Sequence, residues 1–165
     1  MADATTIARE SCGAFWQVTA WPGTIGAVSS RLADITGIAA PGPGEIAHTG
    51  AVQVARVGPL VWWIIGADGA LPDVDTEDGA ALDMTDGRVR FVVAGPRARD
   101  VMMRLAPLDF RESSFAVGTI AATVAHHMSV HIARREAAWD VYVSASFAQT
   151  LAEVLEETVV QWEAA

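Results

Sequence analysis

Three histidines lie close together in the sequence and are the side chains best suited to hold a metal ion. They are His126, His127 and His131, and on a helix the four-residue spacing of the last two would let them share one ion. The neighbouring residues instead alternate with the period of a β-strand. In a strand, four residues span roughly 13 Å, and His126 points to the opposite face. The pattern therefore predicts sheet-surface or interface histidines rather than metal ligands.

Acidic residues offer a second kind of cation site. Asp73, Asp75 and Glu77 have the spacing of the first ligands of a calcium loop. However, Asp78 stands where that loop needs a glycine, and Met84 stands where it needs a bidentate glutamate. We therefore expect a solvated acidic loop.

Two further motifs look functional but lack the required context. Asp83 and Asp86 could form an acid and base pair, yet Thr85-Asp86-Gly87 is typical of a turn whose aspartate bonds its own backbone. The segment Gly42-Pro43-Gly44-Glu45-Ile46-Ala47 superficially matches a dinucleotide fingerprint, but it contains proline and has no strand before it or helix after it. No nucleophile elbow, phosphate loop or zinc-finger spacing occurs. We predict no catalytic, cofactor-binding or metal-binding residue on this chain.

Hydrophobic periodicity predicts the elements that must position these residues. Strands are expected over 14–21, 52–54, 60–65, 88–93, 118–134 and 139–143, with a hairpin or bulge near 126–127. Helices are expected over 25–37, over 98–105 with Pro96 in the first turn, and over 146–162 with a capping box of Ser146 and Gln149. The segments 41–44 and 68–79 are expected to be turns or loops.

Composition limits the possible partners and the compartment. The 165 residues fit one domain, or two small lobes joined near 66–82. A net charge of −9 makes nucleic acid and anionic membranes poor partners. The apolar run Leu60–Ile65 is too short to cross a membrane. The single Cys12, and a start without a basic and apolar leader, favour a reducing cytoplasm.

Tryptophan is the remaining signal, because the chain has six of them and is 52% hydrophobic. Those within strand patterns are expected in the core: Trp62, Trp63 and Trp139. Those near the ends of elements are candidates for a subunit interface: Trp16, Trp21 and Trp162. The apolar excess also predicts that the isolated chain self-associates or dissolves poorly.

The order of short motifs along most of the chain is similar to that of a known family. These motifs are Trp16-Gln17-Val18 through Trp21-Pro22-Gly23, Asp83-Met84-Thr85-Asp86-Gly87-Arg88, Gly95-Pro96-Arg97-Ala98-Arg99-Asp100, Pro107-Leu108-Asp109, Phe115, Gly118, His131-Ile132-Ala133-Arg134, Trp139-Asp140-Val141-Tyr142-Val143 and Ser146-Phe147. In this order the chain resembles the gamma subunit of heterotetrameric sarcosine oxidase. The central part also looks like the folate-dependent aminomethyltransferases, which are longer and have folate-site parts that this chain lacks.

The resemblance implies an α+β fold with antiparallel sheets and helices packed on one side, on an aminomethyltransferase-like scaffold. The strand-rich pattern agrees with this fold. It also implies a non-catalytic, accessory gamma subunit. The complex would demethylate sarcosine to glycine, reduce oxygen to hydrogen peroxide and pass the methyl carbon to tetrahydrofolate. FAD, FMN, NAD and zinc would then belong to the partner subunits.

Two alternatives stay open. One is a free-standing folate- or small-molecule-binding protein of the aminomethyltransferase group, for which Arg88, Arg90 and Arg97 are candidate contacts to the folate tail. The other is a subunit of a sister complex that acts on a different N-methylated amine. The sequence does not separate this from the first interpretation, because substrate choice would reside on another chain.

Overall fold

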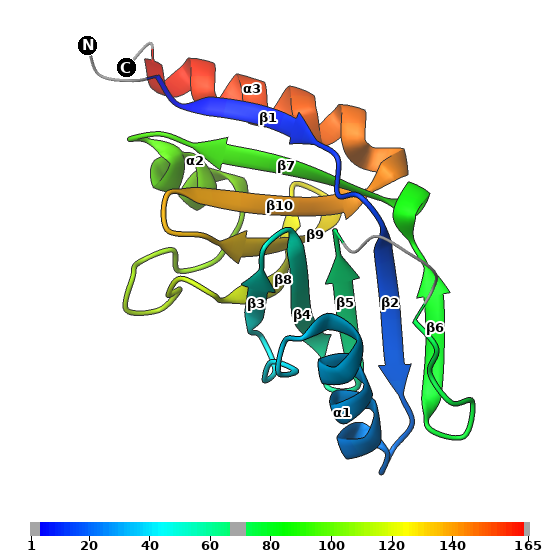
Figure 1. Ribbon diagram of the computed structural model, residues 1–165. Coiled ribbons are helices and arrows are strands. Elements are labelled where there is room, and N and C mark those ends of the chain that lie inside the picture. Colours follow the sequence, from blue (N-terminus) through cyan, green and yellow to red (C-terminus); the bar gives the residue numbers. More distant parts are fainter. Residues whose placement is uncertain (1–3, 67–71, 164–165) are drawn as a thin grey trace. The chain divides into compact units, whose positions relative to one another are not determined.

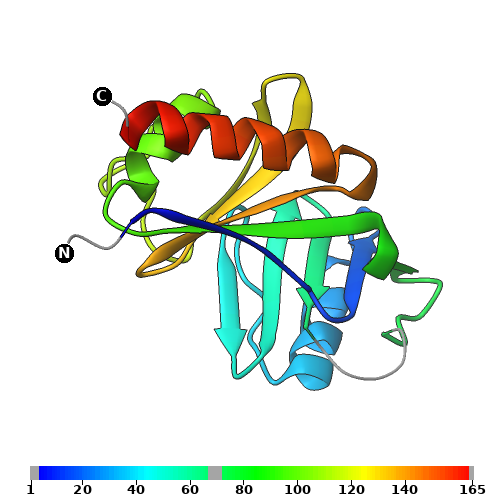
Figure 2. The same cartoon turned by 90° about the horizontal axis from the view of Figure 1, so that it is seen from above.

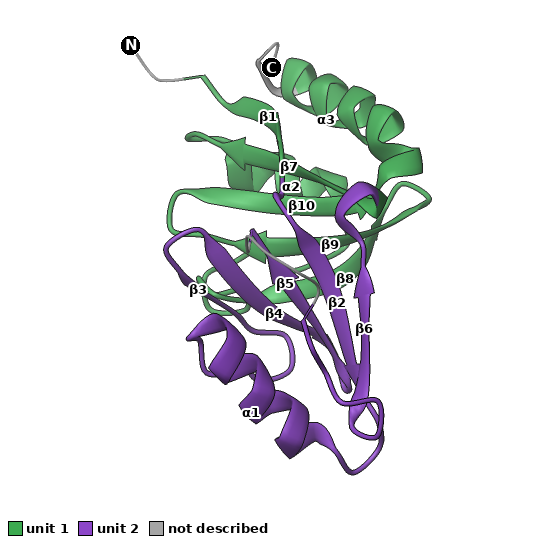
Figure 3. Ribbon diagram, turned by 45° about the vertical axis from the view of Figure 1, so that its right-hand side comes forward, with its two compact units in different colours: residues 1–11, 87–165 green, residues 12–86 purple. Residues whose placement is uncertain are grey.

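The computed structural model describes residues 4–66 and 72–163, which divide into two compact units (Figure 3). Unit 1 comprises residues 1–11 and 87–165, and unit 2 comprises residues 12–86. Unit 2 is therefore inserted in the sequence between two segments of unit 1. The boundaries lie between Ser11 and Cys12 and between Asp86 and Gly87, whereas the sequence suggested a join near 66–82.

Unit 1 is a five-stranded antiparallel sheet with two helices on one face (Figures 1 and 2). The strand order is β1-β7-β10-β9-β8. The elements are β1 (Thr6–Glu10), β7 (Arg88–Ala94), α2 (Ala98–Leu105), β8 (Ile120–Ala125), β9 (Met128–Arg134), β10 (Ala138–Ser144) and α3 (Ala148–Glu163), with the short 3-10 turn η2 (Ala145–Phe147). A second 3-10 turn, η1 (Thr85–Gly87), spans the boundary between the two units in the sequence.

Alternation along the strands of unit 1 creates its core. Every second side chain of β7 and β10 points toward the helices, so Phe91 and Val141 pack against Met102 of α2 and Leu151 of α3. An aromatic cluster fills one end of this core: the Trp139 ring lies edge-on to Phe110 at 5.2 Å and to Phe115 at 5.4 Å between centroids. Such contacts add to the free energy of apolar burial.

Unit 2 is a second five-stranded antiparallel sheet, in the order β3-β4-β5-β2-β6, with one helix against it. Val28 and Leu32 on one face of the helix are buried against Trp16, Trp62 and Ile64 of the sheet. The helix ends at Gly37, whose φ of 70° closes it in the left-handed region. The elements are β2 (Phe15–Ala20), α1 (Ile25–Thr36), β3 (Ile46–Thr49), β4 (Val52–Gly58), β5 (Val61–Ile65) and β6 (Gly79–Asp83).

The predicted α+β fold of antiparallel sheets with helices on one side is confirmed, as are the three helices and the hairpin at 126–127. Three strands were missed: β1, β3 and β6. Pro96 lies in a turn before Arg97, the N-cap of α2, and not in the first helical turn. The predicted capping box is also wrong, because Ser146 lies within η2 and the Gln149 amide donates to Glu153 at 2.9 Å.

Candidate functional site

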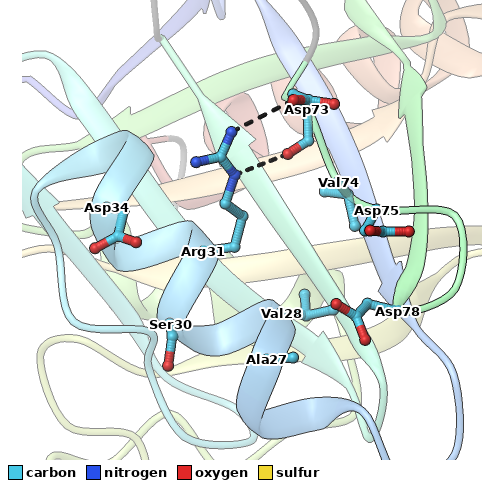
Figure 4. A pocket seen from close by; sticks show the side chains of 9 residues that line it. All are labelled: Ala27, Val28, Ser30, Arg31, Asp34, Asp73, Val74, Asp75 and Asp78. Atoms are coloured by element: carbon cyan, nitrogen blue, oxygen red, sulfur yellow. Dashed lines mark hydrogen bonds and ion pairs between the residues drawn. The ribbon is translucent and has the colours of Figure 1, made fainter.

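A groove in unit 2 lies between α1 and the segment that leads into β6 (Figure 4). Two residues just before α1, Trp21 and Thr24, hold this segment in place. The backbone N–H of Trp21 donates to the carbonyl of Asp78 at 2.9 Å, and the Thr24 hydroxyl donates to the same carbonyl at 2.5 Å. The groove has a volume of about 380 Å³ and is lined by Ala27, Val28, Ser30, Arg31, Asp34, Asp73, Val74, Asp75 and Asp78.

The charge of this groove is negative. Arg31 is the only basic side chain among the described residues that line it. Its Nε donates to the Asp73 carbonyl at 2.9 Å, and its Nη2 lies 3.6 Å from the Asp73 carboxylate. The Asp73 side chain is 94% exposed, so water screens this ion pair. The groove suits a small cationic group, but across residues 4–66 and 72–163 no three His, Cys, Asp or Glu side chains are grouped to hold a metal ion.

A second concentration of polar side chains crosses the unit 1 sheet on the face opposite α2 and α3. Pairing places Glu10, Arg90, Tyr142 and His131 next to one another on β1, β7, β10 and β9. Arg90 donates to the Glu10 carboxylate at 2.9 Å, and Tyr142 is fully buried. Arg88 shares this face, and its guanidinium donates to the Ser144 hydroxyl at 3.2 Å.

Asp140 lies on the same face and is a carboxylate only 1% exposed. Its Oδ1 accepts a hydrogen bond from Arg135 at 2.7 Å, and its Oδ2 is buried with no hydrogen-bond partner in the described part of the chain. Burial raises the pKa of Asp140, and the positive charges of Arg135 and Arg90 oppose that rise.

His131 is kept neutral by its surroundings. Its pKa is lowered to about 4, first by burial and second by the positive charge of Arg88. Perturbed ionisable groups occur at active sites and also in structural ion-pair networks. Because Tyr142 and Asp140 have almost no exposed surface, a substrate cannot reach the middle of this row, and a structural role is favoured.

Comparison with known proteins shows which solved structures have a similar fold. No protein-family model and no curated protein sequence matches the chain. Among solved structures, it is similar to a chain of the heterotetrameric sarcosine oxidase from Corynebacterium sp. U-96 in complex with pyrrole 2-carboxylate, with 24% identity and a TM-score of 0.86. That alignment covers 98% of this chain and 86% of the other. The predicted resemblance is confirmed at the level of the fold.

The chain is also similar to the glycine cleavage system aminomethyltransferase T from Bartonella henselae, with 12% identity and a TM-score of 0.68. This alignment covers 93% of the chain but only 46% of the aminomethyltransferase. The chain thus has an aminomethyltransferase-like fold and spans less than half of that enzyme. In the described residues, no helix is long and apolar enough to cross a membrane.

The structure does not bring the three histidines together. His126 and His127 form the hairpin turn between β8 and β9, with a φ of 52° at His126, and His131 lies in the middle of β9. His127 is therefore a turn residue and not the strand residue on which the sequence argument relied.

The calcium-like aspartates also point to separate partners. Asp73 faces Arg31, whereas the carboxylate of Asp75 accepts the backbone N–H of Glu77 at 2.9 Å. Their segment, residues 72–78, has no regular structure, as predicted; residues 68–71 of the predicted loop lie outside the described residues.

The expected turn at residues 85–87 is confirmed as η1, with one correction. The carboxylate of Asp83, and not that of Asp86, accepts a backbone N–H, from Thr85 at 2.9 Å. Hydrogen bonds from Thr85, its side chain first and its backbone second, lower the pKa of Asp83. This aspartate stabilises the turn.

The glycine-rich segment is a turn, as predicted. The Glu45 carboxylate accepts the backbone N–H of Gly42 at 2.8 Å, and the Gly44 N–H donates to the Arg56 carbonyl at 3.0 Å. The Glu45 side chain thus occupies the turn, and strand β3 begins directly after Glu45. The segment therefore lacks the strand-loop-helix geometry of a dinucleotide site.

Tryptophan burial agrees only in part with the prediction. Trp62, Trp63 and Trp139 are buried, as expected. Trp16 is also buried, at 4% exposure, which corrects its assignment as an interface candidate. Trp21 is 41% exposed and remains a candidate for a subunit interface. The side chain of Trp162 lies outside the described residues.

The three arginines that the sequence suggested as contacts to a folate tail do not all lie on one element. Arg88 and Arg90 lie two residues apart on the polar face of β7, whereas Arg97 is exposed at the N-cap of α2. Asp140 and Tyr142 were not predicted from the sequence. Their signal was present, since they alternate with Trp139, Val141 and Val143 and must therefore point to the opposite face of one strand.

Proposed function

We propose that this chain is a non-catalytic, accessory subunit of a multisubunit amine oxidase of the sarcosine oxidase type. The observation that carries the proposal is the fold similarity to a chain of heterotetrameric sarcosine oxidase. Because it covers 98% of this chain and 86% of the other, the two chains have similar lengths and share nearly their whole architecture.

The chemistry of the described side chains supports an accessory role. The accessible groove contains carboxylates and one arginine that is already paired, and the middle of the polar row on unit 1, at Tyr142 and Asp140, has almost no surface that a substrate could reach. The subunits that carry FAD, FMN, NAD and zinc would then be the partners of this chain, and the complex would work in the cytoplasm.

Exposed apolar side chains give such a subunit the means to bind partners. Large apolar side chains in the described residues are exposed on both units: Trp21, Ile35 and Leu82 on unit 2, and Met103, Val117, Val124, Phe147 and Val160 on unit 1. Subunits of permanent complexes bury such residues at their interfaces.

The test is affinity purification of the tagged full-length chain from its source cell. We expect flavin-bearing chains to co-purify at fixed stoichiometry, and the assembly to oxidise sarcosine to glycine with release of hydrogen peroxide. The isolated chain should be colourless and inactive toward sarcosine. The proposal is contradicted if the chain purifies as a monomer without any flavin-bearing chain, or if it binds flavin stoichiometrically by itself.

Two further measurements separate the alternatives. Titration of the isolated chain with tetrahydrofolate distinguishes a free-standing folate-binding protein, for which binding should weaken in Arg88→Ala and Arg90→Ala. A panel of N-methylated amines, supplied to the purified assembly, distinguishes a sarcosine oxidase from a sister complex. A preference for another amine would replace the substrate but keep the accessory role.

A further inference from the structure

Strand β8 forms one edge of the unit 1 sheet. It lies at the end of the strand order and pairs only with β9. The partners run from Ile120 opposite Ala133 to Ala125 opposite Met128, across the two-residue turn of His126 and His127. The other side of β8 therefore has no neighbouring strand among the described residues.

The register decides which backbone groups face this open side. In a hairpin with a two-residue turn, the residues that flank the turn exchange hydrogen bonds, and every second pair does so along the strands. The hydrogen bond from the Arg134 N–H to the Thr119 carbonyl, at 3.0 Å, fits this series. Ala121 and Thr123 therefore bond to β9, whereas the N–H and C=O groups of Ala122 and Val124 point outward.

The other sheet edges carry features that discourage pairing with a further strand. β1 ends in Arg9 and Glu10, β3 has only four residues, and β6 ends in Asp83. β8 reads Ile-Ala-Ala-Thr-Val-Ala, without charge, proline or glycine. Its residues Ala122 and Val124 have exposed side chains, Val124 by 48%, and Val117 shortly before it is 47% exposed.

We propose that the open edge of β8 receives an extended strand from a flavin-bearing partner subunit, which continues the sheet of unit 1. Outward N–H and C=O groups spaced two residues apart are satisfied by another extended backbone. The small apolar side chains beside them fit an uncharged partner strand with small or β-branched residues. This inference rests on the proposed function, since it names the surface through which the accessory subunit binds.

A partner subunit fits this edge better than a second copy of the chain. Each copy carries a net charge of −9, so two copies repel one another at long range. Residues 118–128, which include β8 and the turn after it, contain no acidic residue and no arginine. This edge is therefore an uncharged surface on an acidic protein.

The test reconstitutes the complex from this chain and the flavin-bearing subunits that co-purify with it. Ala122→Pro removes one outward amide but no hydrogen bond to β9, and proline is tolerated at such an edge position. Val124→Lys places a charge on the edge. Each change should weaken partner binding by at least about tenfold, through lost hydrogen bonds or a desolvated charge. The control is Thr150→Lys on α3, where the threonine is exposed, and it should bind as the parent does.

Hydrogen exchange provides a second readout that needs no variant. In the isolated chain the amides of Ala122 and Val124 should exchange quickly and those of Ala121 and Thr123 slowly, whereas in the complex all four should be protected. If the parent assembles but the edge variants bind equally well, or the outward amides stay unprotected, the β8 inference is wrong and the proposed function stands. If the parent binds no flavin-bearing chain, the proposed function fails, and the inference with it. Self-association through β8, visible by light scattering and lost in Val124→Lys, would assign the edge to a second copy instead.

Discussion

Arg135 donates a hydrogen bond to Asp140 at 2.7 Å, although the two residues differ sharply in exposure. The Arg135 side chain is 43% exposed, whereas that of Asp140 is 1% exposed. The arginine thus connects a buried carboxylate to solvent. Burial of a charged carboxylate costs free energy unless a partner compensates the charge. The folded state therefore depends on the hydrogen bond that Arg135 donates to Asp140.

Removal of that partner should destabilise unit 1. Arg135→Ala leaves the Asp140 charge without its hydrogen bond, and we expect the free energy of unfolding to fall by about 1–3 kcal/mol in urea titrations. The matched control is Arg111→Ala, which removes an exposed ion pair with Asp109 and should leave the urea midpoint near that of the parent. Equal midpoints for the two variants would show that Asp140 does not depend on Arg135.

His131 should make stability depend on pH. Its pKa is lowered to about 4 in the folded chain, below the ordinary value of 6.5, so the unfolded chain binds the proton more readily between these values. The contribution of neutral His131 to the free energy of unfolding is complete above about pH 6.5 and is lost as the pH falls toward 4. We expect His131→Gln to flatten this decline in urea titrations at several pH values, while His127→Gln, in the exposed turn, follows the parent. The raised pKa of Asp140 acts with the opposite sign and is unchanged in both variants.

Phe110 should be a major contributor to the unit 1 core. It is buried at 1% exposure and contacts both Phe115 and Trp139. Phe110→Ala leaves a cavity, and we expect a loss of about 3–5 kcal/mol of unfolding free energy. Phe147→Ala is the control, since that ring is 46% exposed. A comparable loss in both variants, measured by urea unfolding, would mean that the aromatic cluster has no special role.

Two glycines of α1 should respond to alanine with opposite signs. Gly37 has a φ of 70° and open space around it, so Gly37→Ala is penalised by backbone strain alone, by about 1 kcal/mol. Gly26 lies inside the helix with nothing near its added methyl group, so Gly26→Ala should stabilise by up to about 1 kcal/mol. Thermal unfolding of the two variants should bracket the parent; shifts of the same sign would contradict the assigned helix end.

The sequence predicted those elements whose pattern is strong over several residues. Helix α1 has apolar residues at helical spacing and a terminal glycine, and β7 and β10 alternate clearly. The missed strands have weaker patterns: β1 is largely exposed, and β6 reads Gly-Ala-Ala-Leu-Asp. β1 and β6 are strands because a strand distant in the sequence pairs with each of them, β7 and β2 respectively, and local residues do not encode that pairing.

The errors at single residues have a similar origin. Trp16 was placed near an element end, yet alternation with Val18 and Ala20 turns it toward α1. The polar row of Glu10, Arg90, Tyr142 and His131 depends on the register between four strands, two of them far apart in the sequence. Alternation indicates which side of a strand a residue faces, but not which residues it meets there.

The insertion of unit 2 has a consequence for the order of events during synthesis. β1 leaves the ribosome first, but Glu10 and its neighbour Arg90 are separated by 80 residues. At typical elongation rates β1 waits roughly 4–16 s for its partner strand, while the whole of unit 2 emerges and can fold. The first edge of the unit 1 sheet thus stays unpaired until late. A nascent chain stalled just after residue 86 has left the ribosome should contain a folded unit 2 and an amino-terminal strand that proteases still cleave.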